Sequence, residues 1–264
     1  MVGWVAELGE TMEPAGRHAL VTGGGRGIGA AIARALTEAG ARVTVLGRTA
    51  ALLQTLVASG GGAGWELADV TDAEALAAAI ARAEAARGGI DILVNNAGAA
   101  ESAPLARTDR ALWDRMLALN LTSVFEATRL LLPGMVARGY GRVVTIASTA
   151  GLTGYAYVAA YVAAKHGVVG LTRALALEVA RSGVTVNAVC PGFTDTDMLE
   201  ASIASVADKT GRSEDSVRET FVRGNPQGRL VRPEEVATAV LFLCGPGADA
   251  MTGQAIAVAG GEVL

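Results

Sequence analysis

The stretch that decides the fold is Thr22-Gly23-Gly24-Gly25-Arg26-Gly27-Ile28-Gly29. It joins a short β-branched run at residues 18–21 to a helical segment at residues 27–39. Glycines in such a turn allow a sharp bend, close approach of the backbone to a pyrophosphate and tight packing of the helix on the strand. The free N–H groups at the start of the helix then favour the anion. A glycine pattern alone is weak evidence and could mark a turn that is merely tight. Its position between the first strand and the first helix instead predicts a dinucleotide-binding turn.

Outside this turn, short β-branched runs alternate with longer Ala- and Leu-rich segments. The expected strands are residues 18–21, 42–46, 64–67, 90–94, 142–146, 184–189 and 255–258. The expected helices are residues 27–39, 50–58, 73–86, 109–137, 161–181 and 233–244. Such alternation produces right-handed βαβ units and a parallel sheet with helices on both faces. We therefore expect an α/β fold: a single Rossmann-type, doubly wound domain over residues 1–264, with about seven parallel strands.

The alternation is interrupted at residues 194–228, which are more charged and carry Thr, Ser, Asp and Gly breaks between two weak helical patterns. An insertion of this size after a strand end is typical of an active-site lid. We expect residues 194–228 to form a substrate lid within the domain.

Composition excludes several classes of function. Hydrophobic residues make up 51% of the 264 residues, which excludes intrinsic disorder. The net charge is −4 with no long run of either sign, so the chain lacks the basic stripe expected of a nucleic-acid partner. The two cysteines, Cys190 and Cys244, are far apart, and this spacing suits neither a disulfide framework nor a zinc site. We expect no metal, and free thiols favour a reducing compartment such as the cytoplasm.

One uncharged stretch, residues 143–164, is long enough to suggest a membrane helix. However, Ser148, Thr149 and Gly151 lie in its middle, and its β-branched start gives way to an Ala-rich end. We interpret it as a buried strand, a loop and a helix, and we expect no membrane partner.

The second expected strand runs into Gly47-Arg48-Thr49, with no acidic residue between positions 40 and 55. Cofactor turns that bind NAD place an acidic residue there for the ribose hydroxyls, whereas an arginine can accommodate a 2′-phosphate. Arg48, assisted by Arg26 in the glycine-rich turn, therefore favours NADP(H) over NAD(H). The alternative is that Arg48 is only a solvated loop charge.

Four ordered motifs together resemble the short-chain dehydrogenase/reductase family over essentially the whole chain. They are Thr22-Gly23-x-x-x-Gly27-x-Gly29, Asn95-Asn96-Ala97-Gly98, Tyr161-x-x-x-Lys165 and Pro191-Gly192. The resemblance implies an active-site tetrad of Asn120, Ser148, Tyr161 and Lys165. It also implies cofactor contacts from Gly23, Gly25, Arg26, Gly27, Ile28, Arg48, Asp69, Val70, Asn95, Tyr161, Lys165 and Thr194. By this resemblance Asp69 and Val70 flank the adenine and Thr194 reaches the carboxamide.

The chemistry of the tetrad can be argued from the residues. Tyr161 and Lys165 are spaced i and i+4, so they share one helix face. A tyrosine pKa of roughly 10 is too high for proton exchange at neutral pH. We expect the lysine ammonium, aided by an oxidised nicotinamide, to lower it. Tyr161 would then exchange the proton on the substrate oxygen. Ser148 would bind the same oxygen, and Asn120 would support a water relay to Lys165 or merely bend its helix.

Two tyrosines near Tyr161 and the two histidines are expected to have roles other than proton transfer. Tyr155 and Tyr157 lack a lysine four residues on, so they would line or gate the pocket, or simply pack. His18 and His166 are expected to be structural.

Two further stretches of the sequence bear on the identity of the substrate. Residues 163–170 and 187–193 look similar to bacterial ketoreductases that act on 3-oxoacyl thioesters, on acyl carrier protein or coenzyme A, and on polyketides. The alternatives are a dehydrogenase of a secondary or cyclic alcohol and a catalytically silent NADP-binding sensor. The resemblance further implies a homotetramer, with the helices at residues 109–137 and 161–181 packing across one interface.

Overall fold

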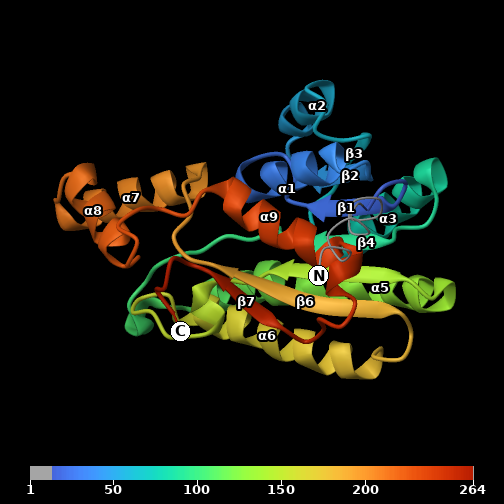
Figure 1. Ribbon diagram of the computed structural model, residues 1–264. Helices are drawn as coiled ribbons and strands as arrows, with labels where there is room; N and C mark the ends of the chain where they lie inside the picture. Colours follow the sequence, from blue (N-terminus) through green and yellow to red (C-terminus); the bar gives the residue numbers. More distant parts are fainter. Residues whose placement is uncertain (1–13, 264) are drawn as a thin grey trace, which may run out of the picture.

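The computed structural model describes residues 14–263, so the first part of the expected domain and its last residue lie outside the described residues. Within them, a parallel sheet has the strand order β3-β2-β1-β4-β5-β6-β7 (Figure 1). The strands are β1 His18–Thr22, β2 Arg42–Gly47, β3 Gly64–Leu67, β4 Ile92–Asn95, β5 Gly141–Ile146, β6 Val184–Pro191 and β7 Ala255–Val258. The predicted α/β, doubly wound Rossmann-type fold is confirmed.

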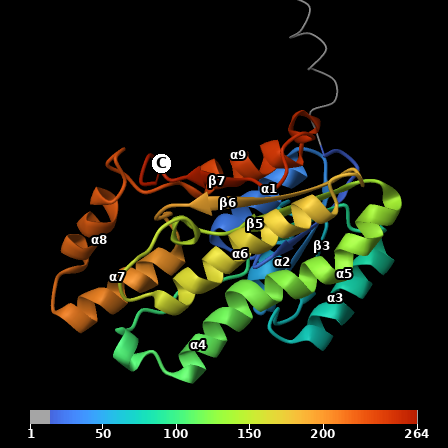
Figure 2. The same ribbon diagram turned by 90° about the horizontal axis from the view of Figure 1, so that it is seen from below.

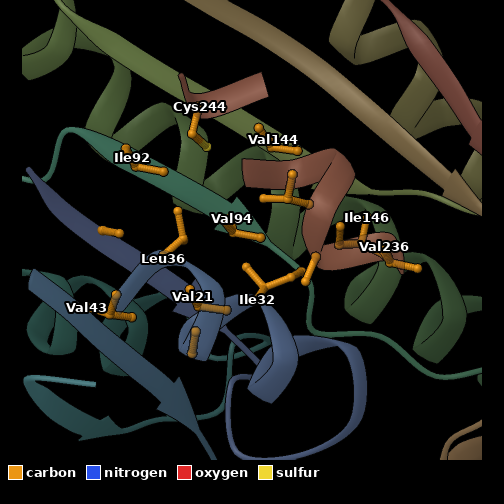
Figure 3. Packing of buried hydrophobic residues seen from close by; sticks show 14 of the residues in the cluster. Val21, Ile32, Leu36, Val43, Ile92, Val94, Val144, Ile146, Val236 and Cys244 are labelled. Carbon is orange, nitrogen blue, oxygen red and sulfur yellow. The ribbon is translucent and has the colours of Figure 1, made fainter. Parts of the chain in front are cut away.

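Helices cover both faces of this sheet. They are α1 Gly27–Glu38, α2 Ala50–Ala58, α3 Ala73–Arg87, α4 Arg110–Leu117, α5 Ser123–Arg138, α6 Ala159–Glu178, α7 Asp197–Thr210, α8 Glu214–Arg223 and α9 Pro233–Cys244. On one face, Ile32 and Leu36 of α1 pack with Val236 of α9 against Val21 and Val94 (Figure 3). On the other, α3, α5 and α6 lie together (Figure 2) and bury side chains such as Leu76, Met135 and Ala176.

The strand order fixes where a ligand can bind. The chain steps outward from β1 through β2 to β3, then returns to the other side of β1 to begin β4. Connections leave β1 and β4 in opposite directions, which opens a crevice at their carboxyl ends. The glycine-rich turn after β1 and the Asn95-Asn96-Ala97-Gly98 segment after β4 both lie at this edge.

The predicted helix at residues 109–137 is interrupted. It begins as α4, passes through a five-residue π turn, η3 Ala118–Thr122, and continues as α5. A π turn inserts one extra residue and keeps the apolar periodicity on both sides, so the sequence pattern hides it. Asn120 lies in this turn, and its side chain is fully buried.

Other boundaries differ by a few residues. The strand predicted at 90–94 is β4 Ile92–Asn95, although the Asp91 N–H also donates to the His18 carbonyl oxygen at the start of β1. The helix predicted at 161–181 is α6 Ala159–Glu178, which begins earlier and ends at a Val179 cap. The strand predicted at 64–67 is β3 as predicted, and Asp69 and Val70 lie just beyond its end.

The predicted insertion at residues 194–228 contains two helices, α7 and α8, which project from the carboxyl edge of the sheet (Figure 1). Each begins with a capping hydroxyl: Thr196 accepts from the Leu199 N–H, and Ser213 from the Ser216 N–H. Leu199, Ile203 and Val217 form a small apolar cluster of their own. Among the described residues, no helix combines the length and apolar character needed to cross a membrane.

Candidate active site

The glycine-rich turn forms a cradle that side chains would fill. A Cβ on Gly24 would lie 2.7 Å from Val45 Cγ1, and one on Gly29 would lie 2.4 Å from the Gly23 carbonyl oxygen. Helix α1 has no side-chain cap at Arg26 and no acidic residue in its first turn. Its first N–H groups therefore remain free for an anion. The residues present fit the pyrophosphate of a dinucleotide.

Asn96, the second residue of the Asn95-Asn96-Ala97-Gly98 motif, holds this cradle in shape. Its Nδ2 donates to the carbonyl oxygens of Thr22 at 2.9 Å and Gly23 at 3.1 Å. The Thr22 hydroxyl oxygen in turn accepts from the backbone N–H groups of Asn96 and Ala97. The turns after β1 and β4 are thus joined by side-chain hydrogen bonds across the crevice.

The end of the crevice beside β2 carries exposed charge. Arg48 Nη1 lies 3.6 Å from Asp69 Oδ2, and the Arg48 side chain is 71% exposed. Although partial burial opposes it, hydrogen bonds from Thr71 and the nearby Arg48 hold the pKa of Asp69 below its usual value. Val70, beside Asp69, is buried. Arg26 Nη1 is 3.9 Å from Asp197 Oδ2, an exposed pair that links the glycine-rich turn to the start of α7.

Tyr161, Lys165 and Ser148 converge at the carboxyl end of β5. The Ser148 side chain adjoins Tyr161 closely enough to act on the titration of its hydroxyl. Lys165 Nζ donates to the Ile146 carbonyl oxygen at 2.8 Å and lies 5.6 Å from the centre of the Tyr161 ring. Lys165 is 4% exposed, so its ammonium group is almost entirely removed from water.

Burial is the main cause of the pKa shifts of both Tyr161 and Lys165. It raises the pKa of Tyr161, with the Ser148 hydrogen bond acting in the opposite direction. It lowers the pKa of Lys165 to about 8. The lowering of the Tyr161 pKa that we expected from the lysine is therefore absent in the chain alone. The physical reason is that the Lys165 ammonium is itself desolvated and is bonded to a backbone carbonyl.

Asn120 connects the π turn to the loop after β4. Its Nδ2 donates to the Ala99 carbonyl oxygen at 2.9 Å and to the Met116 carbonyl oxygen at 3.0 Å, and its Oδ1 accepts from the Ala99 N–H. A Cβ on Gly98 would lie 2.8 Å from Asn120 Oδ1 and 3.7 Å from Lys165 Nζ. Asn120 and Lys165 thus meet at Gly98, where only a glycine fits between them.

The side chains of two expected cofactor contacts are engaged with the protein. Asn95 is buried, and its Nδ2 donates to the Thr128 hydroxyl at 3.1 Å, so it points away from the crevice. Thr194 is also buried and donates to the Gly192 carbonyl oxygen at 2.9 Å. Their cofactor contacts remain predictions and would come from the backbone or after rearrangement.

Both histidines lie away from these groups. His18 is fully buried at the amino end of β1, between the Gly88 carbonyl oxygen and the Thr44 hydroxyl. His166 is exposed on α6 and contacts the Val162 carbonyl oxygen of its own helix.

A second polar group adjoins the tetrad: Tyr155, which the sequence placed at the pocket or in packing, has Glu262 and Thr149 as partners that the sequence did not indicate. The Tyr155 hydroxyl bonds to the Glu262 carboxylate and lies 2.8 Å from the Thr149 hydroxyl. The Tyr155 ring meets the edge of Phe193, the residue after the turn that ends β6. Burial raises the pKa of Tyr155 to about 12, reinforced by the bond to Glu262. Tyr157, by contrast, is 66% exposed and has a left-handed φ of 67°.

The match to a known family is extensive. Residues 17–206 match the family model described as short chain dehydrogenase. The chain belongs to the short-chain dehydrogenase family. It is therefore an oxidoreductase that interconverts carbonyl and CH–OH groups with a nicotinamide cofactor.

Individual relatives of this short-chain dehydrogenase differ in their reactions. A putative ketoacyl reductase of Streptomyces coelicolor is 44% identical over 92% of this chain and 95% of its own length. A D-beta-hydroxybutyrate dehydrogenase of Cupriavidus necator is 40% identical over 94% of this chain and 98% of its own. A crystal structure of a variant actinorhodin polyketide ketoreductase with NADPH superposes with a TM-score of 0.90, at 42% identity over 93% of this chain and 97% of that one.

Proposed function

We propose that this short-chain dehydrogenase is an NADPH-dependent ketoreductase that reduces the 3-oxo group of an acyl thioester or polyketide. The observation that carries the proposal is the placement of Ser148, Tyr161 and Lys165 beside the phosphate cradle at one edge of the sheet. Relatives named as ketoacyl and polyketide ketoreductases support the substrate class.

In this proposal each residue of the tetrad has a separate task. When bound, the reduced nicotinamide supplies the hydride to the carbonyl carbon. Tyr161 gives its hydroxyl proton to the carbonyl oxygen, and its raised pKa keeps that proton available until the substrate arrives. Ser148 hydrogen-bonds the same oxygen and fixes its position. The Lys165 ammonium then stabilises the phenolate, and Asn120 holds the loop against which Lys165 lies.

The preference for NADP(H) rests on Arg48 and Arg26. Arg48 lies at the carboxyl end of β2 and pairs, among the described residues, with Asp69, so its exposed guanidinium can turn to a 2′-phosphate. Gly23, Gly25, Gly27 and Ile28 would line the pyrophosphate, Val70 and Asp69 the adenine, and Thr194 the carboxamide. No acidic residue follows β2 at the position that would bind ribose hydroxyls.

The lid at residues 194–228 would close over the acyl part of the substrate. Phe193 and Phe221 stack edge to face at 4.6 Å where the lid meets the end of β6. These rings, with Leu199 and Ile203 behind them, favour an apolar acyl chain. Residues 198–228 hold four basic and five acidic side chains, which gives no basic cradle for a carrier phosphate. The thioester is therefore placed by its acyl part.

Assembly and location complete the proposal. We propose a homotetramer in the cytoplasm, built on a single catalytic domain over residues 1–264. Large apolar side chains on α4, α5 and α6 support the assembly, because Trp113, Phe125 and Leu177 are exposed on the described surface. Cys190 and Cys244 are buried and free, which supports a reducing compartment.

A substrate panel tests the proposal. NADPH and NADH would each be offered with acetoacetyl-CoA, a decalone and an aryl ketone, and the alcohols would be tested with the oxidised cofactors. We expect NADPH consumption with the 3-oxoacyl thioester. Faster oxidation of a cyclic alcohol would favour the alternative, and a relative named cis-4-hydroxycyclohexanecarboxylate dehydrogenase is 42% identical. Tight NADPH binding without turnover of any ketone would instead indicate a silent sensor.

A further inference from the structure

Glu262 is placed at the substrate end of the site by the segment that follows β7. Gly260 and Gly261 have left-handed φ angles of 61° and 92°, so the chain turns back sharply after Val258. A Cβ on Gly260 would overlap Asn225, which is 4% exposed at the end of the lid. The turn is therefore held against the base of the lid, and it directs the Glu262 side chain toward the ends of β5 and β6.

The Glu262 carboxylate accepts a hydrogen bond from the Tyr155 hydroxyl. A tyrosine hydroxyl has one proton, and an ionised carboxylate can only accept. The Tyr155 hydroxyl donates to Glu262, and the Thr149 hydroxyl lies 2.8 Å from the same Tyr155 oxygen. Thr149 directly follows Ser148 of the tetrad. The Glu262 charge is thus connected through Tyr155 and Thr149 to the residue beside the one that binds the substrate oxygen.

This carboxylate is only partly compensated. One Glu262 oxygen is buried without a hydrogen-bond partner among the described residues, and a Cβ on Gly192 would lie 2.5 Å from it. Gly192 is the turn after β6, next to Phe193 on the substrate side. Burial raises the pKa of the Glu262 carboxyl, while the bond from Tyr155 acts in the opposite direction.

Cations of the lid are already engaged elsewhere. Arg218 bonds to Glu200, Arg223 to Glu219, and Lys209 to the Ser102 carbonyl oxygen. Arg212 bonds to the Ser216 carbonyl oxygen and to the Thr220 hydroxyl. In the described part of the lid, each of these four side chains has a protein acceptor. An anionic substrate would therefore meet the Glu262 charge with no lid cation, within the described residues, that lacks a protein acceptor.

We propose that Glu262 is a specificity residue that rejects ketones carrying a free carboxylate and so reserves the site for neutral 3-oxo esters and thioesters. Two like charges at a half-buried edge repel more strongly than in water, and the substrate carboxylate would also lose hydration there. This inference rests on the proposed function and narrows its substrate class. Overall sequence identity does not distinguish the two substrate classes, because a relative named as a ketoacyl reductase is 44% identical to this chain and one named as a hydroxybutyrate dehydrogenase is 40% identical. The charge of Glu262 would distinguish them.

The test compares two substrates that share one carbon skeleton. Ethyl acetoacetate is neutral and acetoacetate is anionic at neutral pH, and both would be reduced with NADPH. We expect kcat/KM for the ester to exceed that for the acid by at least about 10-fold in the wild type, the size of a modest like-charge penalty. Glu262→Gln keeps an acceptor for Tyr155 and removes the charge. It should lower this ratio by about 10-fold, through a smaller KM for acetoacetate.

A control variant tests whether the effect is specific to Glu262, and a salt series tests whether it is electrostatic. Glu66→Gln removes one carboxylate from β3, at the opposite edge of the sheet from β7, and should leave the ratio unchanged. In the wild type, raising salt from about 0.05 to about 0.5 M should lower the ratio by screening the repulsion. This arm needs no variant and shows whether charge repulsion sets the ratio, while Glu262→Gln assigns that repulsion to this carboxylate.

Three results would overturn the inference. They are a wild-type ratio near unity, a ratio that Glu262→Gln leaves unchanged, and a ratio that is independent of salt. Each of them leaves the proposed ketoreductase activity standing, because the ester is still reduced. A chain that reduces neither substrate nor any other ketone would overturn the proposed function itself, and this inference with it.

Discussion

Lys165 holds an ammonium group where water scarcely reaches it, and its environment is poorly suited to a charge. Burial lowers the pKa of this lysine to about 8, and its Nζ donates a hydrogen bond to the Ile146 carbonyl oxygen. The cation that the active site needs beside Tyr161 therefore lowers the free energy of unfolding. Substituting Lys165 and measuring both stability and turnover shows how much stability the chain loses by keeping this cation.

Lys165→Met should abolish turnover and stabilise the protein. Below pH 8 the buried charge costs on the order of 3 kcal/mol, from the depression of its pKa. Loss of the bond to Ile146 offsets about 1–2 kcal/mol of this. We expect a net gain of about 1 kcal/mol, or about 2–4 °C in Tm. Reductase activity should fall at least about 100-fold. A lower Tm in a thermal melt at pH 7 would contradict the account.

The pH dependence of activity follows from the same group. Tyr161 stays protonated well above neutral pH because burial raises its pKa, so the proton donor is not limiting. Lys165 loses its proton near pH 8, and reduction should decline as pH rises through that value. Stability changes in the opposite sense. Between pH 8 and the usual lysine pKa the unfolded chain binds the extra proton, so the free energy of unfolding should rise with pH. Rate and denaturation profiles across this range check both signs.

Arg48→Asp should shift cofactor preference toward NADH. The substitution removes the cation available to a 2′-phosphate and supplies an acceptor for ribose hydroxyls. It also places a carboxylate beside Asp69, which lies 3.6 Å from Arg48 in the native chain. We expect the ratio of NADPH to NADH dissociation constants, from fluorescence titration, to change by at least about 10-fold. An unchanged ratio would refute the role of Arg48.

At the scale of elements, the glycine-rich turn and the π turn are the two pieces of backbone that build the site. Each departs from regular geometry, and each is fixed by a side-chain amide: Asn96 holds the first and Asn120 the second. Both amides bridge to a neighbouring loop rather than to their own element alone. The site therefore depends on contacts between elements that lie far apart in the sequence.

Gly29→Ala should abolish NADPH binding. Its Cβ would lie 2.4 Å from the Gly23 carbonyl oxygen and 2.5 Å from Asn96 Nδ2, a contact that forces the turn apart. Gly170→Ala is the matched control, because a Cβ there meets nothing within 4 Å and α6 is helical at that point. It should stabilise the chain by about 0.5–1 kcal/mol and leave NADPH affinity intact. Equal affinities in the two variants would show that the cradle does not bind the cofactor.

Asn120→Ala should cost both stability and activity. It leaves the Ala99 and Met116 carbonyl oxygens without their donor, a loss of about 1–3 kcal/mol in urea unfolding. The loop at Gly98 would also move relative to Lys165, and kcat should fall about 10-fold or more. Ser123→Ala removes a bond to Leu119 in the adjoining turn without touching that loop. Its kcat should stay near the wild-type value, and an equal loss in both variants would reduce Asn120 to a helix-bending role.

Local pattern predicted the strands and most helices to within a few residues, because buried parallel strands read as continuous apolar runs. It missed the π turn, since helical periodicity continues across Asn120. It could not orient Asn95, whose side chain faces inward at the end of β4. Glu262 carried no local signal at all. Its place at the site depends on a turn at Gly260 and Gly261 and on packing against the lid, which only the folded chain supplies.

At the scale of the whole molecule, the exposed side chains of α4, α5 and α6 bear on assembly. Leu177 is 82% exposed on α6, the helix that also carries Tyr161 and Lys165. A subunit interface on the exposed side of α6 would hold in place the helix that carries Tyr161 and Lys165. The proposed tetramer and the proposed activity are therefore linked through one element.

Leu177→Glu should weaken that assembly. A charge placed in an apolar interface is costly, so light scattering after size exclusion should report a smaller species than the wild-type tetramer. Thr238→Glu changes the exposed surface of α9 and serves as the comparison. A wild type that is already monomeric, or a tetramer indifferent to Leu177→Glu, would contradict this interface.

In the proposed mechanism, Tyr161 donates the proton during NADPH-dependent reduction of a neutral ketone. The most direct measurement is the consumption of NADPH by wild type and Tyr161→Phe with ethyl acetoacetate, alongside NADPH affinity by fluorescence titration. We predict turnover in the wild type, a loss of at least about 100-fold in the variant, and NADPH affinity within a few-fold of wild type. Near-normal turnover by Tyr161→Phe would contradict the account.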